Sequence, residues 1–368
     1  MRTVVVLGGY GNFGRRIVHA LAGDGAYRVI VAGRNATKAQ TIAREVGAHG
    51  IAIDTAAEEL PEILRSLSAD LLIHTAGPFQ NQSYAVARAC IDTGTHYIDL
   101  ADGRAYVCGI RELDAQAQAN AVLIVSGASS LPALSSAVVD RFSPQFSRMQ
   151  ELDVGISSGA RPPGRATMDG VLAYVGRPFT QWCDGSWKTV HGWQDMRSQS
   201  YPRPVGTRWI ANCDVPDLQL FPQRYATLER VTFRAGVGPK YSMLGLWIGS
   251  WLVRAGILRT LVPYVPRLHR TALALAPFGS RCSAMHVTIR GLDHNNVARS
   301  RSWYLIAEND HGPDIPCFPA IALARKMLRG EIHSRGAMPC MGLLTVDEIL
   351  GVGRDLYLRT EESEHELI

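Results

Sequence analysis

The sequence lacks the short motifs that would assign several common chemistries. It has no Tyr-x-x-x-Lys pair, no His-Glu-x-x-His and no Cys-x-x-Cys. These absences argue against the short-chain dehydrogenase mechanism, a zincin-type metal site and a paired-thiol site. Zinc-finger spacing and the aromatic signature of RNA-recognition motifs are also missing, and the formal net charge is only +5, from 38 Lys and Arg against 33 Asp and Glu. We therefore expect neither a metal site nor a nucleic-acid partner.

Cysteine and lysine are both sparse. The seven cysteines are scattered and odd in number, which is typical of reduced thiols in a cytoplasmic protein. Lysine occurs at only four positions, so that nearly all basic residues are arginine. Neither a basic segment nor a cleavage site precedes the first apolar run, so we expect no secretory signal and a cytoplasmic location. With 46% hydrophobic and 19% charged residues over 368 positions, the composition indicates a globular chain of about two domains.

The most informative stretch is a glycine-rich turn close to the N-terminus. Thr3–Leu7 is a short, uncharged, β-branched run, as in a strand buried on both faces. It leads into Gly9, Gly11 and Gly14, which have the G-x-G-x-x-G spacing, and then into an apparent helix. The first glycine permits a tight turn, the second lets the backbone approach a pyrophosphate, and the third lets the helix pack close to the strand. The pattern predicts a dinucleotide site at the helix N-terminus. Its predicted contacts are Gly9, Tyr10, Gly11, Asn12, Phe13 and Gly14.

Arg34 and Asn35 follow the second predicted strand, Tyr27–Ala32. An acidic residue about 20 positions after the glycine motif would hold the ribose hydroxyl of NAD, whereas an arginine suits the 2′-phosphate of NADP. We therefore expect NADP(H) as the cofactor, and the alternative is an ordinary exposed loop arginine. Asn35 is a candidate cofactor contact and also a candidate cap for the next helix. Asp54, after a third strand, is a further candidate beside the adenine.

Strand-like and helix-like segments alternate through the first 130 residues. The six predicted strands are Thr3–Leu7, Tyr27–Ala32, Gly50–Ile53, Leu71–Thr75, Tyr97–Leu100 and Val122–Val125. Six strands alternating with helices describe a doubly wound parallel sheet of the Rossmann type, in the α/β class. Ligands bind at the carboxyl ends of such strands. Ala76, Gly77 and Pro78, after the fourth strand, are therefore further predicted cofactor contacts.

The pattern changes after about residue 130. Residues 150–240 are irregular and rich in Gly, Pro, Arg and Trp, with scattered strand-like pieces. Met285–Ile289 and Trp303–Ala307 resemble two antiparallel strands. We interpret this half as an α+β domain with a mixed sheet. Its tryptophans at 182, 187, 193 and 209 either line an apolar cleft or belong to the core and interface, and the last residues, 361–368, are expected to be frayed.

Four segments together resemble the saccharopine dehydrogenase-like family, in its NADP-binding oxidoreductase branch. They are Gly8–Gly14, Ala32–Asn35, Ala76–Phe79 and, most specifically, Ala89-Cys90 with Gly94-Thr-His-Tyr-Ile-Asp-Leu100. The resemblance is strong over about the first 140 residues, and Gly312–Pro316 and Gly336–Cys340 look like the C-terminal part of the same family. One position departs from the family pattern, because this chain has Asp102-Gly103 where members often carry Gly-Glu.

The resemblance implies a Rossmann domain over residues 1–130, an inserted substrate and dimerisation domain over 131–309, and a segment over 310–368 that packs back on the Rossmann domain. It also implies a homodimer that transfers a hydride between NADP(H) and a small-molecule or lipid-like substrate, in a cleft between the domains. The competing interpretation is a non-catalytic protein that binds NADP(H) as a sensor or structural ligand. What favours that alternative is that no proton donor is obvious in the sequence.

Hydride transfer needs a side chain that passes a proton, while the cofactor supplies the redox chemistry. His96, Tyr97, Asp99 and Asp102 lie in or just after the fifth strand. Asp99 and Asp102 are nearest the carboxyl edge of the sheet, so they are the predicted catalytic residues. The alternative is that Asp99 caps the following turn and His96 is a structural histidine.

Tyr241–Leu268 is the most apolar stretch of the chain, and residues 241–253 carry no charge. A run of this length is shorter than the roughly 20 apolar residues that span a bilayer. It fits a core or dimer-interface helix, a lid over a hydrophobic substrate, or a helix that lies on a membrane surface. We expect the first, with the segment buried by its own chain or by a partner subunit, so that membrane contact is the less favoured interpretation.

Overall fold

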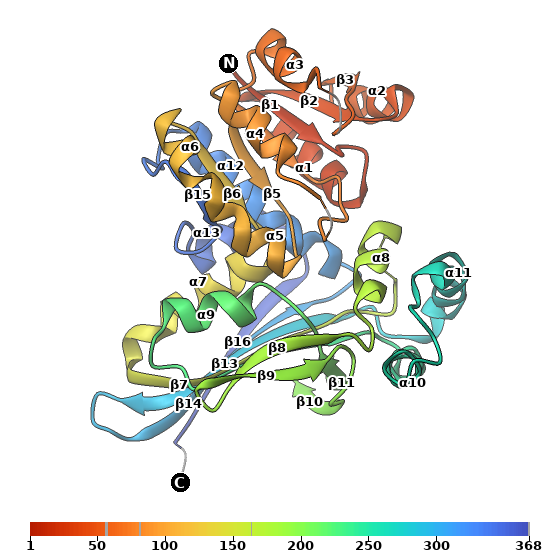
Figure 1. Cartoon of the computed structure of the whole chain (residues 1–368), viewed down its shortest axis with the longest axis vertical. Coiled ribbons are helices and arrows are strands. Elements are labelled where there is room, and N and C mark those ends of the chain that lie inside the picture. Colours follow the sequence, from red (N-terminus) through yellow and green to blue (C-terminus); the bar gives the residue numbers. More distant parts are fainter. Residues whose placement is uncertain (56–57, 81, 163, 367–368) are drawn as a thin grey trace. The chain divides into compact units, whose positions relative to one another are not determined.

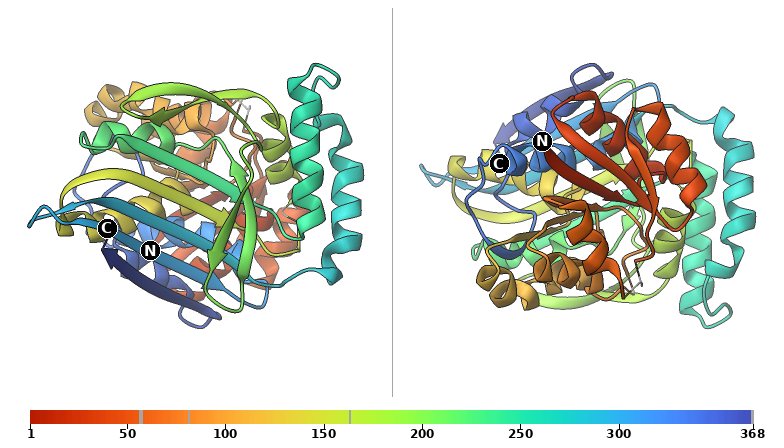
Figure 2. Two further views of the ribbon diagram at one scale, coloured as in Figure 1. Left: turned by 90° about the horizontal axis from the view of Figure 1, so that it is seen from below. Right: turned by 90° about the horizontal axis from the view of Figure 1, so that it is seen from above.

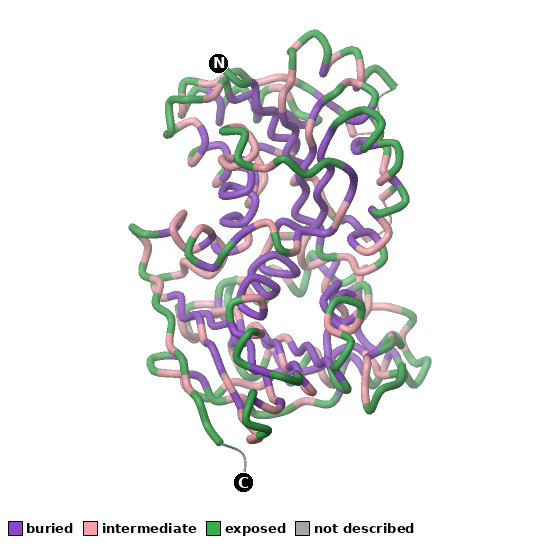
Figure 3. The backbone as a smooth tube through the Cα atoms, turned by 90° about the vertical axis from the view of Figure 1, so that its left-hand side faces the viewer, coloured by how far each residue is buried: buried purple, intermediate pink, exposed green. Residues whose placement is uncertain are grey.

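The computed structural model describes the 368-residue chain except residues 56–57, 81, 163 and 367–368. The chain forms two compact units (Figure 1). The first consists of Met1–Ser136 and Asp314–Gly353, and the second of Ala137–Pro313 and Arg354–Ile368. Each unit has a buried core of its own, drawn in purple in Figure 3.

A seven-stranded parallel sheet forms the centre of the first unit, in the order β15-β6-β5-β4-β1-β2-β3. Its strands are β1 (Arg2–Leu7), β2 (Tyr27–Gly33), β3 (His49–Ala52), β4 (Leu71–His74), β5 (His96–Asp99), β6 (Leu123–Ser126) and β15 (Gly336–Pro339). The apolar side chains of β1 are completely buried, as the β-branched run predicts. The predicted doubly wound sheet is confirmed, with β15 as a seventh strand that adds to the six predicted ones.

Helices cover this sheet, and some of them come from the end of the chain. They are α1 (Asn12–Gly23), α2 (Ala36–Glu45), α3 (Leu60–Leu67), α4 (Ala85–Asp92), α5 (Arg104–Gly109), η1 (Ile110–Leu113), α6 (Asp114–Ala119), η2 (Ser130–Leu134), η6 (Gly312–Cys317), α12 (Phe318–Leu328), α13 (Val346–Leu350) and η7 (Gly351–Gly353). The helix α12 packs on α1, β4 and β5, with Phe318–Ala324 buried. Arg325 holds it there through two hydrogen bonds to Asp24, at 2.7 and 2.8 Å. The predicted return of C-terminal helices to the Rossmann domain is confirmed.

The second unit is built on a mixed seven-stranded sheet in the order β10-β11-β12-β7-β13-β14-β16. Neighbouring strands are antiparallel except β12 and β7, which are parallel. The strands are β7 (Phe146–Ser157), β10 (Arg197–Tyr201), β11 (Gly206–Asn212), β12 (Arg230–Gly236), β13 (Ser283–Asp293), β14 (Ala298–Ala307) and β16 (Leu358–Glu366), with a separate hairpin of β8 (Pro178–Cys183) and β9 (Ser186–His191). The helical segments are α7 (Ser135–Phe142), η3 (Ser143–Gln145), α8 (Arg165–Ala173), α9 (Asp217–Arg224), α10 (Lys240–Arg254), η4 (Val262–Tyr264), α11 (Val265–Leu275) and η5 (Ala276–Phe278).

The two faces of this second sheet differ in chemistry. On β7, Leu152 and Val154 point to the apolar, buried face, while Glu151 and Asp153 point to the other. Residues in register on the neighbouring strands keep the alternation, so that Thr232 and Thr288 lie beside Asp153. One face of the sheet is therefore a polar surface within the second unit.

The end of the chain differs from the prediction. Residues 361–368 were expected to be frayed, and residues 310–368 were expected to return as one segment to the Rossmann domain. Instead, Leu358–Glu366 pairs with β14 as the antiparallel edge strand β16. Arg301 on β14 contacts both Glu362 and Glu364, at 2.8 and 2.6 Å. Cross-strand pairing and alternating charge thus place residues 358–366 in the second unit, while residues 367–368 of the expected frayed tail lie outside the described residues.

Candidate functional site

The glycine-rich turn joins β1 to α1 at the carboxyl edge of the first sheet. Gly8 has a positive φ of 83°, and its N–H donates to the carbonyl of Ala32 on β2 at 2.8 Å. Gly11 N–H donates back to the Gly8 carbonyl at 2.8 Å, which closes the turn. The turn therefore lies against the ends of both β1 and β2, as the glycine pattern predicts.

Two of the motif glycines leave no room for a side chain. A β-carbon on Gly14 would meet the Gly8 carbonyl oxygen at 2.3 Å, and one on Gly9 would meet both Val31 and the Val6 carbonyl at 2.8 Å. Gly14 is thus required by the close approach of α1 to the turn, and Gly9 by the close approach of the turn to β1 and β2. These close approaches bring a helix N-terminus to a strand end.

The N-terminus of α1 is electrostatically open to an anion. Gly11 precedes the helix without a side-chain cap, and the first turn contains no acidic residue. The unpaired N–H groups and the positive end of the helix dipole therefore face the glycine turn. Of the predicted contacts here, Asn12 has its side-chain oxygen engaged by Arg16 at 2.6 Å. The carbonyl of Phe13 accepts a long contact from the Cys317 thiol at 3.6 Å.

Tyr10 and Arg34 shape the site at the end of β2. The Tyr10 ring covers Gly33, where a β-carbon would meet the ring at 2.6 Å, and the Tyr10 hydroxyl accepts a hydrogen bond from the N–H of Asn35 at 3.2 Å. Arg34 is exposed and forms no ion pair with the residues that the structure describes. Asn35 caps α2 by accepting from the N–H of Lys38 at 2.9 Å, which confirms the capping prediction.

Lys38 is a candidate that the sequence argument missed. It is exposed in the first turn of α2, one turn after Arg34. Two basic side chains therefore start close to the end of β2, where NAD-specific sites carry an acid. Asp54 is exposed after β3, the strand that pairs with β2.

The turn after β4 contains the predicted contacts Ala76, Gly77 and Pro78. Thr75 ties this turn to β1, because its N–H and its hydroxyl both donate to the Leu7 carbonyl, at 2.8 and 3.0 Å. Gln82 was not predicted, but its amide donates to the carbonyls of Ala76 and Pro78 at 2.8 and 2.9 Å. The turn therefore lies beside the glycine loop in a fixed conformation.

Asp99 is completely buried at the end of β5. Its Oδ1 accepts hydrogen bonds from the N–H groups of Gly127 and Ala101 and from the Ser126 hydroxyl, at 2.8, 2.9 and 2.9 Å. Loss of hydration raises the pKa of Asp99 to about 6, although these hydrogen bonds act to lower it. The carboxyl thus holds the turn after β6 against β5.

Asp102 lies three residues further on and is exposed. Its Oδ1 accepts a hydrogen bond from the Gln80 amide at 3.1 Å, in the turn after β4. Loss of hydration at the carboxyl raises the pKa of Asp102, although hydrogen bonds from its own backbone N–H and from the Gln80 amide act to lower it. The two predicted catalytic carboxyls therefore differ in access, and only Asp102 is open to solvent.

The other candidates of β5 are structural. His96 lies at the amino end of β5, away from the glycine loop, and its Nδ1 accepts from the N–H of Leu123 at 2.9 Å. Tyr97 is completely buried, and its hydroxyl contacts His74 Nδ1 and the Tyr106 hydroxyl at 3.1 and 3.2 Å. Burial lowers the pKa of His74 to about 3, so this histidine is neutral at physiological pH.

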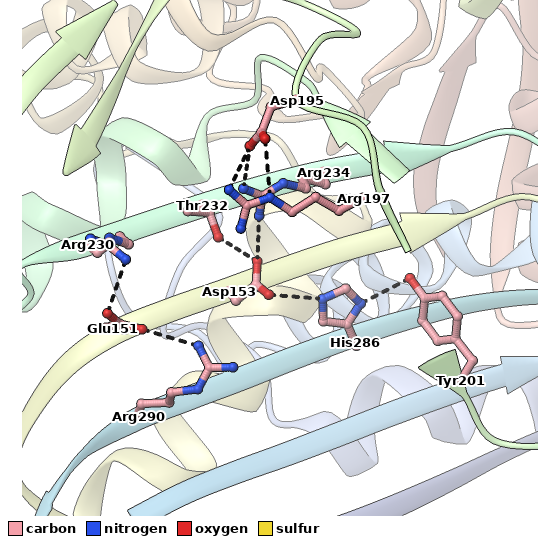
Figure 4. Close-up of polar contacts among 10 residues, drawn as sticks. All are labelled: Glu151, Asp153, Asp195, Arg197, Tyr201, Arg230, Thr232, Arg234, His286 and Arg290. Carbon is pink, nitrogen blue, oxygen red and sulfur yellow. Dashed lines mark hydrogen bonds and ion pairs between the residues drawn. The ribbon is translucent and has the colours of Figure 1, made fainter. Parts of the chain in front are cut away.

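A second polar cluster lies on the polar face of the second sheet (Figure 4). His286 contacts the Tyr201 hydroxyl at 3.0 Å through Nδ1, while its Nε2 is 3.7 Å from Asp153, which is long for a hydrogen bond. Arg234, which is almost fully buried, pairs with Asp195 at 3.0 Å and with Asp153 at 3.4 Å. The residues of this cluster come from distant parts of the sequence, and no spacing pattern in the sequence predicts that they meet.

The described residues provide the geometry of neither a serine nucleophile elbow nor a metal site. Gly155-Ile-Ser-Ser-Gly159 has the spacing of a nucleophile elbow, but Ser157 is buried in β7 and the next helix begins only at Arg165. The strand–turn–helix geometry of such an elbow is therefore missing. Within the described part of the chain, no three His, Cys, Asp or Glu side chains gather in an arrangement that would hold a metal ion.

Comparison with known proteins gives a family match over residues 4–125 and a similar fold for the whole chain. Residues 4–125 match the saccharopine dehydrogenase NADP-binding domain family. The chain is similar to apo saccharopine dehydrogenase (L-Glu forming) from Saccharomyces cerevisiae, with a TM-score of 0.70 and 14% identity over 99% of this chain and 100% of that chain. It is also similar to a homospermidine synthase from Legionella pneumophila in complex with NAD, with a TM-score of 0.62 and 12% identity over 99% and 91% of the chains. At these identities the structural similarities establish the fold alone. A comparison with curated proteins found no match.

Proposed function

We propose, on the premise that residues 4–125 belong to the family of saccharopine dehydrogenase NADP-binding domains, that this protein is an NADP(H)-dependent oxidoreductase. In the proposed reaction a hydride passes between the nicotinamide and a small-molecule or lipid-like substrate. The observation that carries the proposal is the glycine turn, in which Gly9 and Gly14 have no room for a β-carbon and the following helix N-terminus is uncapped. This combination suits the pyrophosphate of a dinucleotide.

The residues at the end of β2 support NADP(H) over NAD(H). Arg34 and Lys38 are exposed, and no acidic residue occupies the turn Gly33-Arg34-Asn35. A guanidinium can hold the 2′-phosphate through two parallel hydrogen bonds and can stack on the adenine. Tyr10, held by the N–H of Asn35, fixes the backbone from which Arg34 extends.

The start of α1 and the turn after β4 would form the rest of the dinucleotide site, and both have a fixed conformation. The N–H groups at the start of α1 would hold the pyrophosphate, and the turn Ala76–Pro78, locked by Gln82, would lie along the cofactor beyond it. The bound nicotinamide would supply the hydride chemistry. The chain would contribute binding, orientation and a proton.

For that proton we propose Asp102 rather than Asp99. Asp102 is exposed at the carboxyl edge of the sheet, and loss of hydration raises the pKa of its carboxyl. Asp99 is completely buried and engaged by Gly127, Ala101 and Ser126, so we assign it a positioning role for the turn after β6. Gln80, which donates to Asp102, would orient the proposed proton donor.

The test follows the hydride directly. Two preparations of NADPH are used, each with deuterium at C4 of the nicotinamide on one of its two faces. The protein is incubated with each preparation and with fractions of a metabolite and lipid extract. Mass spectrometry then identifies any product that carries deuterium. The expected result is a labelled product that forms only with the protein, and whose formation Asp102→Asn slows strongly without weakening NADPH binding. Tight NADPH binding without label transfer to any fraction would contradict the enzyme proposal and favour the sensor interpretation.

A further inference from the structure

The outward side of α10 is apolar. Tyr241, Leu244, Ile248 and Trp251 follow one another at spacings of three and four residues, so they share one side of the helix. Each of these side chains is between 39% and 47% exposed. A surface helix ordinarily turns polar residues to solvent, whereas α10 turns apolar residues to solvent as well as to the interior. The sequence-based expectation is burial by the chain or by a partner subunit, and the chain itself leaves this side of the helix exposed.

The inward side of α10 is already used for packing within the second unit. Met243, Gly249, Ser250 and Val253 are buried. Gly249 lies so close to Leu261 that an added β-carbon would meet Leu261 Cδ1 at 2.9 Å. The helix cannot rotate its apolar stripe inward without giving up this contact, so the exposure is built into the fold.

The neighbouring helix α11 contributes further exposed apolar side chains. Figure 2 shows α10 and α11 side by side at one edge of the second unit, and the Tyr241 hydroxyl donates to the Leu275 carbonyl at 3.3 Å. Ile257, in the connection between the helices, is 69% exposed, and Leu268 on α11 is also exposed. We call Tyr241, Leu244, Ile248, Trp251, Ile257 and Leu268 the α10–α11 surface. An exposed cluster of this kind marks an interaction site more often than a chance surface.

The charge around this surface is of one sign. From Arg230 to Leu292 the sequence contains eight arginines and one lysine and no Asp or Glu, whereas the whole chain has a net charge of only +5. Arg254, Arg259, Arg267 and Arg270 lie in or next to α10 and α11, and none of them pairs with a carboxylate of the described residues. The apolar surface therefore has an unneutralised positive rim.

We propose that the α10–α11 surface docks this protein on the surface of an anionic lipid bilayer. The apolar side chains would enter the boundary between headgroups and acyl chains, the aromatic rings of Tyr241 and Trp251 suit that boundary, and the arginines would meet lipid phosphates. Within the described residues, no helix has the length and apolarity that crossing a bilayer requires. The contact is therefore one that lies on the membrane.

Charge favours a bilayer over a second copy of the chain. In a two-fold symmetric dimer the same patch occurs on both subunits, so the arginine rim of one copy would face the arginine rim of the other. Like charges placed opposite each other across an interface oppose association. An anionic bilayer instead supplies the opposite charge over the whole surface.

The test is flotation of the full chain with lipid vesicles. One set of vesicles mixes phosphatidylglycerol with phosphatidylcholine, and the other is pure phosphatidylcholine. Ile248→Glu/Trp251→Glu places two carboxylates in the stripe, at side chains that are already half exposed. Trp187→Glu is the matched control, since Trp187 is 44% exposed on β9. Arg267→Gln/Arg270→Gln removes charge from α11 without changing the apolar stripe.

The wild type and Trp187→Glu should float with the anionic vesicles, less so at high salt. Ile248→Glu/Trp251→Glu should bind at least tenfold more weakly with an unchanged circular dichroism spectrum, and Arg267→Gln/Arg270→Gln should lose the preference for anionic lipid. If the glutamate variant fails to fold, the arginine variant decides, because equal flotation by it and the wild type overturns the proposal. A wild type that stays with the soluble fraction overturns it too. The proposal is also overturned if the wild type is a dimer that binds no vesicles and the glutamate variant is a monomer. That result would assign the surface to contact with a second copy.

Discussion

Asp99 at the end of β5 accepts a hydrogen bond from the N–H of Gly127 at 2.8 Å, although the two residues are 28 positions apart. The opposite carboxyl oxygen, Oδ2, is buried without a hydrogen-bond partner among the described residues. The side chain is thus strongly bound on one side and desolvated on the other. The desolvation is the larger effect, since the pKa of Asp99 is raised from 3.8 to about 6.

This raised pKa predicts how Asp99→Asn changes stability with pH. Between pH 3.8 and about 6 the folded protein binds a proton that the unfolded chain has released, so the wild type loses stability as pH rises through this window. The shift corresponds to about 3 kcal/mol in the free energy of unfolding. Asparagine keeps the accepting oxygen and does not titrate. Relative to the wild type, the variant should therefore gain stability from about pH 4 to pH 7, by up to this amount.

The measurement for Asp99→Asn must report on the first unit. All seven tryptophans lie in the second unit, so hydrogen exchange of peptides from β5 and β6, corrected for the intrinsic effect of pH, is the suitable probe. A stability difference between variant and wild type that stays constant over this pH range would contradict the pKa assignment.

Gly14→Ala should abolish dinucleotide binding. The new β-carbon would lie 2.3 Å from the Gly8 carbonyl oxygen, so α1 must move away from the turn. Such overpacking costs about 1–3 kcal/mol of stability and displaces the N–H groups that hold the pyrophosphate. Gly23→Ala, in the same helix but with no atom within 4 Å of the new carbon, should bind NADPH normally and gain up to about 1 kcal/mol. NADPH fluorescence titration and thermal melting separate the two, and equal NADPH affinities would show that the turn is not the cofactor site.

Arg34→Gln tests the choice of cofactor. If Arg34 holds the 2′-phosphate, the variant should lose about 1.5–3 kcal/mol of binding free energy for NADPH, roughly tenfold to a hundredfold in affinity, and little for NADH. Arg44→Gln is the matched control, because Arg44 is an exposed arginine of α2 whose guanidinium donates to the Gln40 carbonyl and forms no ion pair with the described residues. Isothermal titration of the wild type and both variants with each cofactor measures the six affinities. Equal losses of binding free energy for NADPH and NADH would contradict the assignment of Arg34 to the 2′-phosphate.

The first unit was predictable because its signals are local. The glycine spacing, the β-branched run of β1 and the alternation of strands and helices each lie within one stretch of sequence, and each dictates a conformation there. Gln80 and Gln82 were missed for the opposite reason. A glutamine that locks a turn through its side-chain amide carries no distinctive spacing, and only the folded chain shows what it contacts.

The second unit shows where sequence reasoning fails. Asp153 and His286 meet because β7 and β13 pair, and Tyr201 contacts His286 from the end of β10, which neighbours neither strand in the sheet; no periodicity encodes such non-local contacts. The sequence predicts a frayed charged tail, whereas residues 358–366 form β16, because their stabilisation comes from arginines on the distant strand β14. For the apolar stretch containing α10 the sequence predicts burial by the chain or a partner subunit, and the chain covers only one of its sides, because an apolar run does not say which side the fold covers.

The buried network around Asp153 gives the last prediction. Burial acts to raise the pKa of Asp153, but interactions with His286, Thr232 and Arg234 outweigh it and lower the pKa from 3.8 to about 2. The ionised carboxylate therefore contributes stability above pH 3.8, and this contribution is lost as pH falls through about 2. Asp153→Asn should lower the free energy of unfolding at pH 7 by about 2–3 kcal/mol, since Arg234 loses a partner while buried.

Asp184→Asn is the control, because Asp184 pairs with Lys188 and Arg230 at an exposed position and its loss should matter much less. Urea denaturation followed by tryptophan fluorescence reports on this unit alone, because every tryptophan lies in it. If the two variants are equally stable at pH 7, the network is not a source of stability for the second sheet.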